Sequence, residues 1–133
     1  MSTAENKELV RRYFDERWNH NNLAICDELL APGADIDGAK EFVRSFTSIF
    51  GNIHLTILDL LAESDQVAVH WRITGTHQGR YLGVAATGKP VTYQGLALLR
   101  VEDDKIVDDI AYWDNLSILQ QIGSAPEEGQ GSA

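Results

Sequence analysis

Apolar side chains recur at helical spacing through the first fifty residues. Ser2 and Glu5 form a capping-box pattern. The stripe that follows them consists of Leu9, Val10, Tyr13, Phe14 and Trp18. A shorter repeat runs from Asn22 to Leu30, and a third begins near Asp37 and stops at Gly51. These patterns predict three amphipathic helices.

From Gly51 onward the period changes from helical to strand-like. The expected strands are His54 to Glu63, Gln66 to His77, Val91 to Val101 and Ile106 to Asn115. Successive strands joined by short turns are antiparallel, because parallel neighbours need a long crossover. A short terminal helix from Leu116 to Gly123 follows, and the acidic tail, residues 124–133, is expected to be disordered. Helices followed by an antiparallel sheet predict one α+β domain over residues 1–123.

The predicted strands carry large apolar side chains on both faces, as the neighbouring Tyr112 and Trp113 illustrate. An antiparallel sheet that is apolar on both faces usually has both covered. Helices can cover one face, and a second copy of the chain is the simplest cover for the other. We therefore expect a homodimer formed through the sheet.

Composition narrows the class of protein. The chain has 133 residues, of which 44% are hydrophobic, and eleven Lys and Arg against twenty Asp and Glu give a net charge of −9. Nucleic acids and anionic membranes attract basic surfaces, so neither is expected as a partner. No apolar run approaches the roughly 20 residues of a membrane helix, and the first residues lack the order of a signal peptide. A cytoplasmic protein is expected, with the single Cys26 as a core residue.

Two segments carry a family resemblance. GTHQGRYLG at residues 75–83, with TGKPV at residues 87–91, resembles a hairpin of the SnoaL-like polyketide cyclases. KIV at 105–107, WDNL at 113–116 and LQQIG at 119–123 resemble the closing segment of the same family. The resemblance implies a cone-shaped α+β barrel of the nuclear transport factor 2-like type, with a curved antiparallel sheet wrapped around three helices. That scaffold hosts cyclases, isomerases, epoxide hydrolases, hydroxylases and non-catalytic binders.

The resemblance implies a catalytic role for Asp114, which matches the aspartate that serves the polyketide cyclases as acid/base in an intramolecular aldol closure. Removing a proton next to a carbonyl needs a carboxylate in an apolar setting, where desolvation raises its pKa. If Asp114 faces such a pocket, strand alternation places Tyr112 on the same side and Trp113 on the other. The alternative is that Asp114 caps the terminal helix.

The chain departs from the family in two places. Many relatives carry Glu-His-Trp where this chain has Asp108-Asp109-Ile110, and the loop between the second and third helices is short. In the ketosteroid isomerase branch a proton-shuttling aspartate lies near that loop, so Asp37 or Asp35 is an alternative base. We favour Asp37 as the cap of the third helix.

His77 belongs to the matched hairpin, and its imidazole is a candidate acid or orienting group. The histidines and Cys26 show no metal-ligand spacing, and no glycine loop of the phosphate-binding kind is present in the sequence. Neither a metal nor an organic cofactor is expected.

The helix stripes and strand parity predict a substrate pocket in the core. Its expected wall consists of Tyr13, Trp18, Phe46, Phe50, Tyr93, Gln94 and Tyr112. The predicted function is an aldol-type ring closure, or a related proton transfer, on a small apolar or polycyclic carbonyl compound, with Asp114 and His77 as catalytic residues. The alternatives are a non-catalytic binder and an isomerase, epoxide hydrolase or cofactor-independent hydroxylase of the same fold.

Overall fold

A computed structural model describes residues 2–123, and the predicted tail, residues 124–133, lies outside them. Three helices come first, four strands follow, and a fourth helix ends the described chain. Their bounds are α1 Thr3–Asn19, α2 Ala24–Leu29, α3 Ile36–Ile49, β1 Phe50–Glu63, β2 Gln66–His77, β3 Pro90–Glu102, β4 Lys105–Trp113 and α4 Asn115–Ile122.

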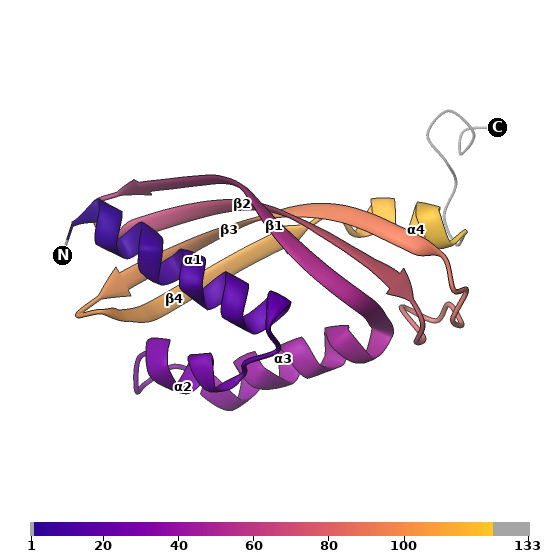
Figure 1. The fold of residues 1–133 in the computed structure, drawn as a ribbon, viewed down its shortest axis with the longest axis horizontal. Coiled ribbons are helices and arrows are strands. Elements are labelled where there is room, and N and C mark those ends of the chain that lie inside the picture. Colours follow the sequence, from indigo (N-terminus) through magenta and orange to yellow (C-terminus); the bar gives the residue numbers. More distant parts are fainter. Residues whose placement is uncertain (1, 124–133) are drawn as a thin grey trace.

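The strands form one antiparallel sheet in the order β1-β2-β3-β4. Helices α1, α2 and α3 lie on one side of this sheet, and α4 lies at the end of it (Figure 1). The α+β architecture predicted from the change of period is therefore confirmed. Strand β1 begins at Phe50, four residues before the expected start, because no loop separates it from α3.

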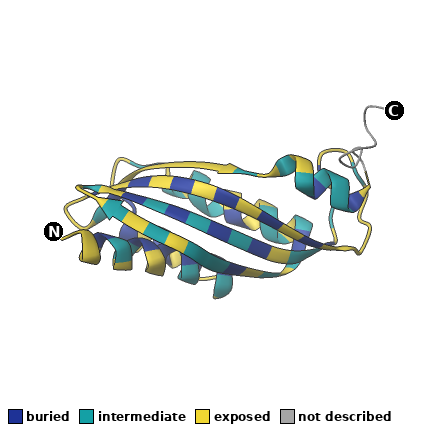
Figure 2. Cartoon of the chain, turned by 90° about the horizontal axis from the view of Figure 1, so that it is seen from above, coloured by how far each residue is buried: buried dark blue, intermediate teal, exposed yellow. Residues whose placement is uncertain are grey.

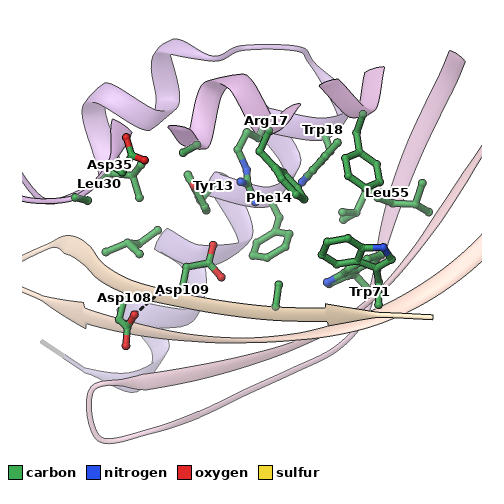
Figure 3. A pocket seen from close by; sticks show the side chains of 18 of the residues that line it. Tyr13, Phe14, Arg17, Trp18, Leu30, Asp35, Leu55, Trp71, Asp108 and Asp109 are labelled. Atoms are coloured by element: carbon green, nitrogen blue, oxygen red, sulfur yellow. Dashed lines mark hydrogen bonds between the residues drawn. The ribbon is translucent and has the colours of Figure 1, made fainter. Parts of the chain in front are cut away.

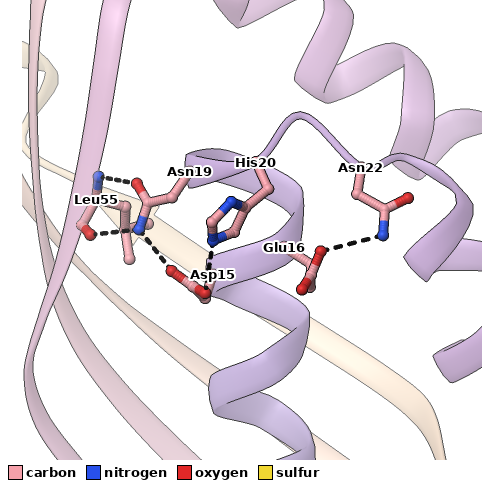
Figure 4. A network of polar contacts seen from close by, with 6 residues as sticks. All are labelled: Asp15, Glu16, Asn19, His20, Asn22 and Leu55. Atoms are coloured by element: carbon pink, nitrogen blue, oxygen red, sulfur yellow. Dashed lines mark hydrogen bonds and ion pairs between the residues drawn. The ribbon is translucent and has the colours of Figure 1, made fainter.

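Helix α1 is fixed at both ends by side-chain hydrogen bonds. At its start, the Ser2 hydroxyl accepts from the Glu5 backbone N–H (3.1 Å) and the Glu5 carboxylate accepts from that of Ser2 (3.0 Å), as the capping box predicts. At its end, the Asn19 side chain donates to the Leu55 carbonyl (2.9 Å) and accepts from the Leu55 N–H (2.7 Å). Figure 4 shows this pair of bonds between α1 and β1, together with the Asp15 carboxylate that accepts from Asn19.

Bulges bend the sheet at the places where it must curve around the helices. The pairing of β1 with β2 shifts register twice, between Gly51 and His54 and between Ile57 and Asp59. The pairing of β3 with β4 shifts once, which leaves Val107 as an extra residue. A bulge bends its strand and increases the local twist, so these shifts give the sheet a concave and a convex face.

The two faces of the sheet differ in what they touch. Along β3, every second residue from Val91 to Val101 is buried, and the residues between them are exposed. Figure 2 shows the alternation of buried and exposed positions along the strands. The buried set meets the helices, and the outer set includes exposed apolar residues such as Leu96, Leu98, Ile110 and Tyr112.

Candidate functional site

A cavity of about 500 Å³ lies between the helices and the concave face of the sheet (Figure 3). All four strands, α1, α3 and the loop before α3 contribute to its wall. The lining residues are Tyr13, Phe14, Arg17, Trp18, Leu30, Ala34, Asp35, Ala39, Phe42, Phe46, Leu55, Trp71, Ile73, Tyr93, Ile106, Val107, Asp108, Asp109, Ala111 and Trp113. Most of them are apolar or aromatic, as in pockets that take small organic molecules.

One side of the cavity is a cluster of aromatic rings from α1, α3 and β4. The Phe46 ring meets Trp113 edge to face at 5.5 Å and Trp18 at 6.3 Å, and Phe42 lies 5.8 Å from Trp113. Edge-to-face pairs at these separations are favourable and hold one another in place. The cluster presents a rigid apolar surface to a ligand.

Trp71 of β2 reaches the cavity across the neighbouring strand. It pairs with Gly95 in the sheet, and its ring meets Tyr93 edge to face at 5.8 Å. A β-carbon at Gly95 would overlap the Trp71 ring and the backbone oxygen of Tyr112. The absence of a side chain at Gly95 therefore lets the indole lie flat against β3.

Two charged side chains, Arg17 and Asp109, extend toward the same part of the cavity from α1 and β4 (Figure 3). Arg17 is only 6% exposed, and its guanidinium lies over the Tyr13 ring, 4.0 Å from the centroid. Within residues 2–123 neither side chain takes part in a hydrogen bond or an ion pair that satisfies ordinary distance limits, and the buried Nε of Arg17 has no partner. The two charges are therefore close enough to interact but are not paired.

The environment changes the acidity of Asp109. Burial raises the pKa of its carboxyl, the Arg17 guanidinium opposes that change, and the Asp108 carboxylate adds to it. Asp109 is itself an exposed residue that borders the cavity, so the surrounding protein removes only part of its water. A carboxylate of raised pKa without a partner is a stronger base than an ordinary surface aspartate.

The bulge in β4 explains how Asp109 reaches the cavity. Strict alternation would bring only every second residue to one face, but Val107 is unpaired and residues 106 to 109 all line the wall. Beyond the bulge the alternation resumes, with Ala111 and Trp113 facing inward. Tyr112 faces outward and is 75% exposed. The predicted orientation of Tyr112 and Trp113 is thus reversed.

Asp114 lies outside the cavity, contrary to the expected placement. It is exposed and is the N-cap of α4, where its carboxylate accepts from the Ser117 backbone N–H at 3.0 Å. The physical reason is that β4 ends at Trp113 with its indole inward, so the next side chain turns toward the first turn of the helix. The structure therefore has the capping arrangement that the sequence left as an alternative.

The remaining predicted site residues fall into two groups. Tyr13, Trp18, Phe46 and Tyr93 line the cavity. Phe50, Gln94, Tyr112 and His77 do not line it. Phe50 is fully buried in the core, and Gln94, on the outer face of β3, accepts from Nε2 of His70 at 2.8 Å.

His77 has a structural setting. It is fully buried, and its Nδ1 lies 2.9 Å from the Thr87 hydroxyl and 3.3 Å from the Thr87 backbone N–H. These contacts connect the end of β2 to the segment before β3. Because His77 does not reach the cavity, the geometry gives it no route to a ligand there.

Of the two acidic residues before α3, only one reaches the cavity wall. Asp35 is the N-cap of α3 and accepts from the Gly38 N–H at 2.9 Å, so the expected cap at Asp37 is wrong by two residues. Asp37 lies in the first turn of the helix, exposed and outside the wall. The Asp35 carboxylate lines the cavity but is already engaged by the helix.

Sequence reasoning missed Arg17, Asp109, Phe42, Trp71 and Trp113 as wall residues. The available signal was an acidic pair at residues 108–109 at the place where many relatives have Glu-His-Trp. Assigning the inward parity to Trp113 instead of Asp114 would have brought Asp109 to the same face.

Within residues 2–123, no group of three or more His, Cys, Asp or Glu side chains could hold a metal ion. No helix in that range is long and apolar enough to cross a membrane.

Several solved protein structures have a fold similar to that of this chain. AclR from Streptomyces galilaeus, a proposed hydroxylase, is 25% identical with a TM-score of 0.85, over 95% of this chain and 89% of its own. A proposed SnoaL-like polyketide cyclase from Jannaschia sp. CCS1 is 26% identical with a TM-score of 0.83, over 94% and 95% of the two chains. An NTF2-like protein from Burkholderia thailandensis is 18% identical with a TM-score of 0.74, over 92% and 98%.

These structures confirm the nuclear transport factor 2-like fold that the sequence resemblance implied. None of the curated proteins compared with the chain matches it. The model of the SnoaL-like polyketide cyclase family matches residues 8–122, which include every strand, the whole cavity wall and both resembling segments except Gly123. The chain belongs to the SnoaL-like polyketide cyclase family.

Proposed function

We propose that the chain is a cofactor-independent cyclase that closes a ring in a small apolar carbonyl compound by an aldol-type reaction, with Asp109 as general acid/base. One observation carries the proposal. Asp109 is a carboxylate without a hydrogen-bonded partner among the described residues, it borders a largely apolar cavity, and burial raises the pKa of its carboxyl. The family supports a small-molecule substrate, and Asp109 takes the catalytic role that the sequence gave to Asp114.

The chemistry needs one group that first takes a proton and then returns it. The Asp109 carboxylate removes a proton from the carbon next to a carbonyl, which leaves an enolate. The enolate carbon forms a bond to a second carbonyl carbon of the same molecule, whose oxygen becomes an alkoxide. The Asp109 carboxylic acid then gives its proton to that alkoxide, so the enzyme returns to its starting state.

The aromatic cluster supports the same proposal through shape. Ring closure requires a flexible substrate to fold so that its two reacting carbons approach each other. Trp71 and Trp113 lie in one row across the concave face, on either side of Gly95, and Phe42 and Phe46 of α3 pack against Trp113, so the rings favour a compact apolar ligand.

We also propose that the protein is a homodimer through the convex face of the sheet. Leu96 and Leu98 of β3 lie beside Tyr112 and Ile110 of β4, and all four are exposed. This row of apolar side chains is the part of the sheet that no helix covers within residues 2–123. A second copy would remove it from water.

The test compares Asp109→Asn with Asp114→Asn on an aryl-substituted 1,5-diketone. Its aldol closure gives a β-hydroxycyclohexanone, which then loses water to form a cyclohexenone that is followed by absorbance. Asparagine is nearly the same size but is not a base, so Asp109→Asn should lower kcat/KM by about a hundredfold or more. Asp114→Asn is the matched control: asparagine also caps helices, so turnover should stay within about twofold of wild type.

Three results would contradict the proposal. Loss of turnover in Asp114→Asn alone would return the catalytic role to that residue. Equal losses in both variants would show that neither carboxylate acts as the specific base. Tight binding of the diketone with no conversion by the wild type would identify a ligand-binding protein.

A further inference from the structure

Arg17 is a buried cation in the cavity wall that the ring closure described above does not use. It is 6% exposed, lines the cavity and projects from α1 beside Asp109 (Figure 3). A guanidinium keeps its charge at any ordinary pH, so loss of a proton cannot remove the free-energy cost of burying that charge. Its charge must be balanced by its surroundings or by a ligand.

The surroundings balance that charge only in part. The guanidinium lies 4.0 Å from the Tyr13 ring centroid, 5.2 Å from that of Phe14 and 5.5 Å from that of Trp18. Such contacts are attractive but offset only part of the free energy that burial of an ion costs. Asp109 contributes an opposite charge across the cavity, but the two groups do not form an ion pair.

The hydrogen-bonding capacity of Arg17 is also unused. A guanidinium offers five N–H donors in a planar fork that matches a carboxylate. Among residues 2–123 no side chain or backbone oxygen accepts from this fork, and Nε is buried without a partner. The stacking on Tyr13 fixes the plane of the fork while its donors stay free.

We infer that Arg17 is the specificity-determining residue of the cavity and that it binds the carboxylate of an aromatic or polycyclic acid. The inference rests on the proposed function only in taking the cavity as the substrate site. In that arrangement the acid group is held on the α1 side, and the apolar body of the ligand lies against the aromatic cluster. The carbon to be deprotonated is then presented to Asp109 on β4.

The overall charge of the chain makes this local site necessary for such a ligand. The net charge of −9 repels anions at long range, so an acid gains nothing from the protein as a whole. Affinity for an acid must therefore come from a desolvated, directional contact inside the cavity. Arg17 is the one positively charged residue among the described residues that line the cavity.

The test uses two unreactive probes of the same shape, naphthalene-2-carboxylate and naphthalene-2-carboxamide, with binding measured by calorimetry. Wild type should bind the carboxylate at least tenfold more tightly than the amide. Arg17→Met should remove that preference and leave amide binding within about threefold. Arg17→Lys should keep part of the preference, because it retains the charge and loses the fork. Arg44→Met, which removes an exposed arginine of α3, is the matched control and should behave as wild type.

Folding is checked in the same variants by thermal unfolding without ligand. Removal of an unpaired buried charge should leave the Tm of Arg17→Met unchanged or higher. Equal binding of the two probes by wild type, or a preference that survives in Arg17→Met, would overturn the inference. If Arg17→Met does not fold, the Arg17 cation supports the structure and the inference fails unless Arg17→Gln folds and has lost the preference. Because the probes cannot cyclise, these outcomes are independent of whether Asp109 is a catalyst.

Discussion

Asp109 and Asp114 are five residues apart and have different surroundings. The Asp114 carboxylate is exposed, accepts from a backbone N–H of α4 and lies outside the cavity wall. Asp109 is also exposed, but it borders the cavity, where the surrounding protein raises the pKa of its carboxyl, and among the described residues its carboxylate accepts no hydrogen bond. The same side chain is thus a cap in one place and a candidate base in the other because of what surrounds it.

The raised pKa of Asp109 predicts the pH dependence of turnover. The base is the ionised form, so kcat/KM should fall as the pH drops through the pKa of Asp109 in the folded protein. Because burial raises that pKa, the acid limb should lie above the ordinary aspartate value of about 3.9. Arg17→Met removes the charge that lowers it, so the limb should move to still higher pH.

A kcat/KM profile from pH 3 to pH 8 measures the position of the acid limb in wild type and in Arg17→Met. An acid limb at or below the ordinary aspartate value would show that Asp109 is not the titrating base. A limb that moves to lower pH in Arg17→Met would contradict the assigned direction of the interaction between Arg17 and Asp109.

At the scale of elements, β4 and its neighbours decide what faces the cavity. The bulge at Val107 brings consecutive residues to the wall, and the strand ends with Trp113 inward. Across the sheet, Gly95 on β3 leaves room for Trp71 of β2 to lie against it. The aromatic surface of the cavity therefore depends on a strand position that has no side chain.

Gly95→Ala should destabilise the fold and disturb the cavity together. The added methyl group would overlap the Trp71 ring and the Tyr112 carbonyl, and overpacking of this kind costs about 1–3 kcal/mol. Urea unfolding measures the loss. Gly33→Ala is the control, because its β-carbon would meet open space, and its effect should stay within about 0.5 kcal/mol. A wild-type midpoint for Gly95→Ala would show that Trp71 relaxes without cost.

At the scale of the whole molecule, the sheet separates two environments. Its concave face encloses the cavity with α1 and α3, and its convex face exposes the apolar row that includes Leu96 and Tyr112. A contiguous exposed apolar patch of this kind commonly marks an interaction site. The convex face is where the proposed dimer forms.

Tyr112→Glu should weaken that dimer. It places one new negative charge from each subunit at the contact, between chains that already carry a net charge of −9 each. Sedimentation velocity at micromolar concentration should show a dimer for wild type and a monomer for the variant. Leu82→Glu, at a 63% exposed apolar residue outside the sheet, is the control and should remain dimeric. A monomeric wild type at that concentration would exclude the proposed interface.

The sequence by itself determined the order of helices and strands, the antiparallel sheet and the family. Hydrophobic period is a local property, so the stripe from Val10 to Trp18 and the alternation along β3 are visible without the fold. It also found part of the cavity wall, because Tyr13, Trp18, Phe46 and Tyr93 lie on those inward faces.

Only the tertiary structure decided which aspartate faces the cavity. The parity of β4 depends on a bulge and on the strand's register against β3, and the sequence of β4 alone allows either face to be inward. Arg17 lies within the inward stripe of α1, but whether a carboxylate pairs with it depends on residues almost a hundred positions away. Contacts between residues so far apart in the sequence form only when the chain folds. The relation between Asp109 and Arg17 was therefore visible only in the structure.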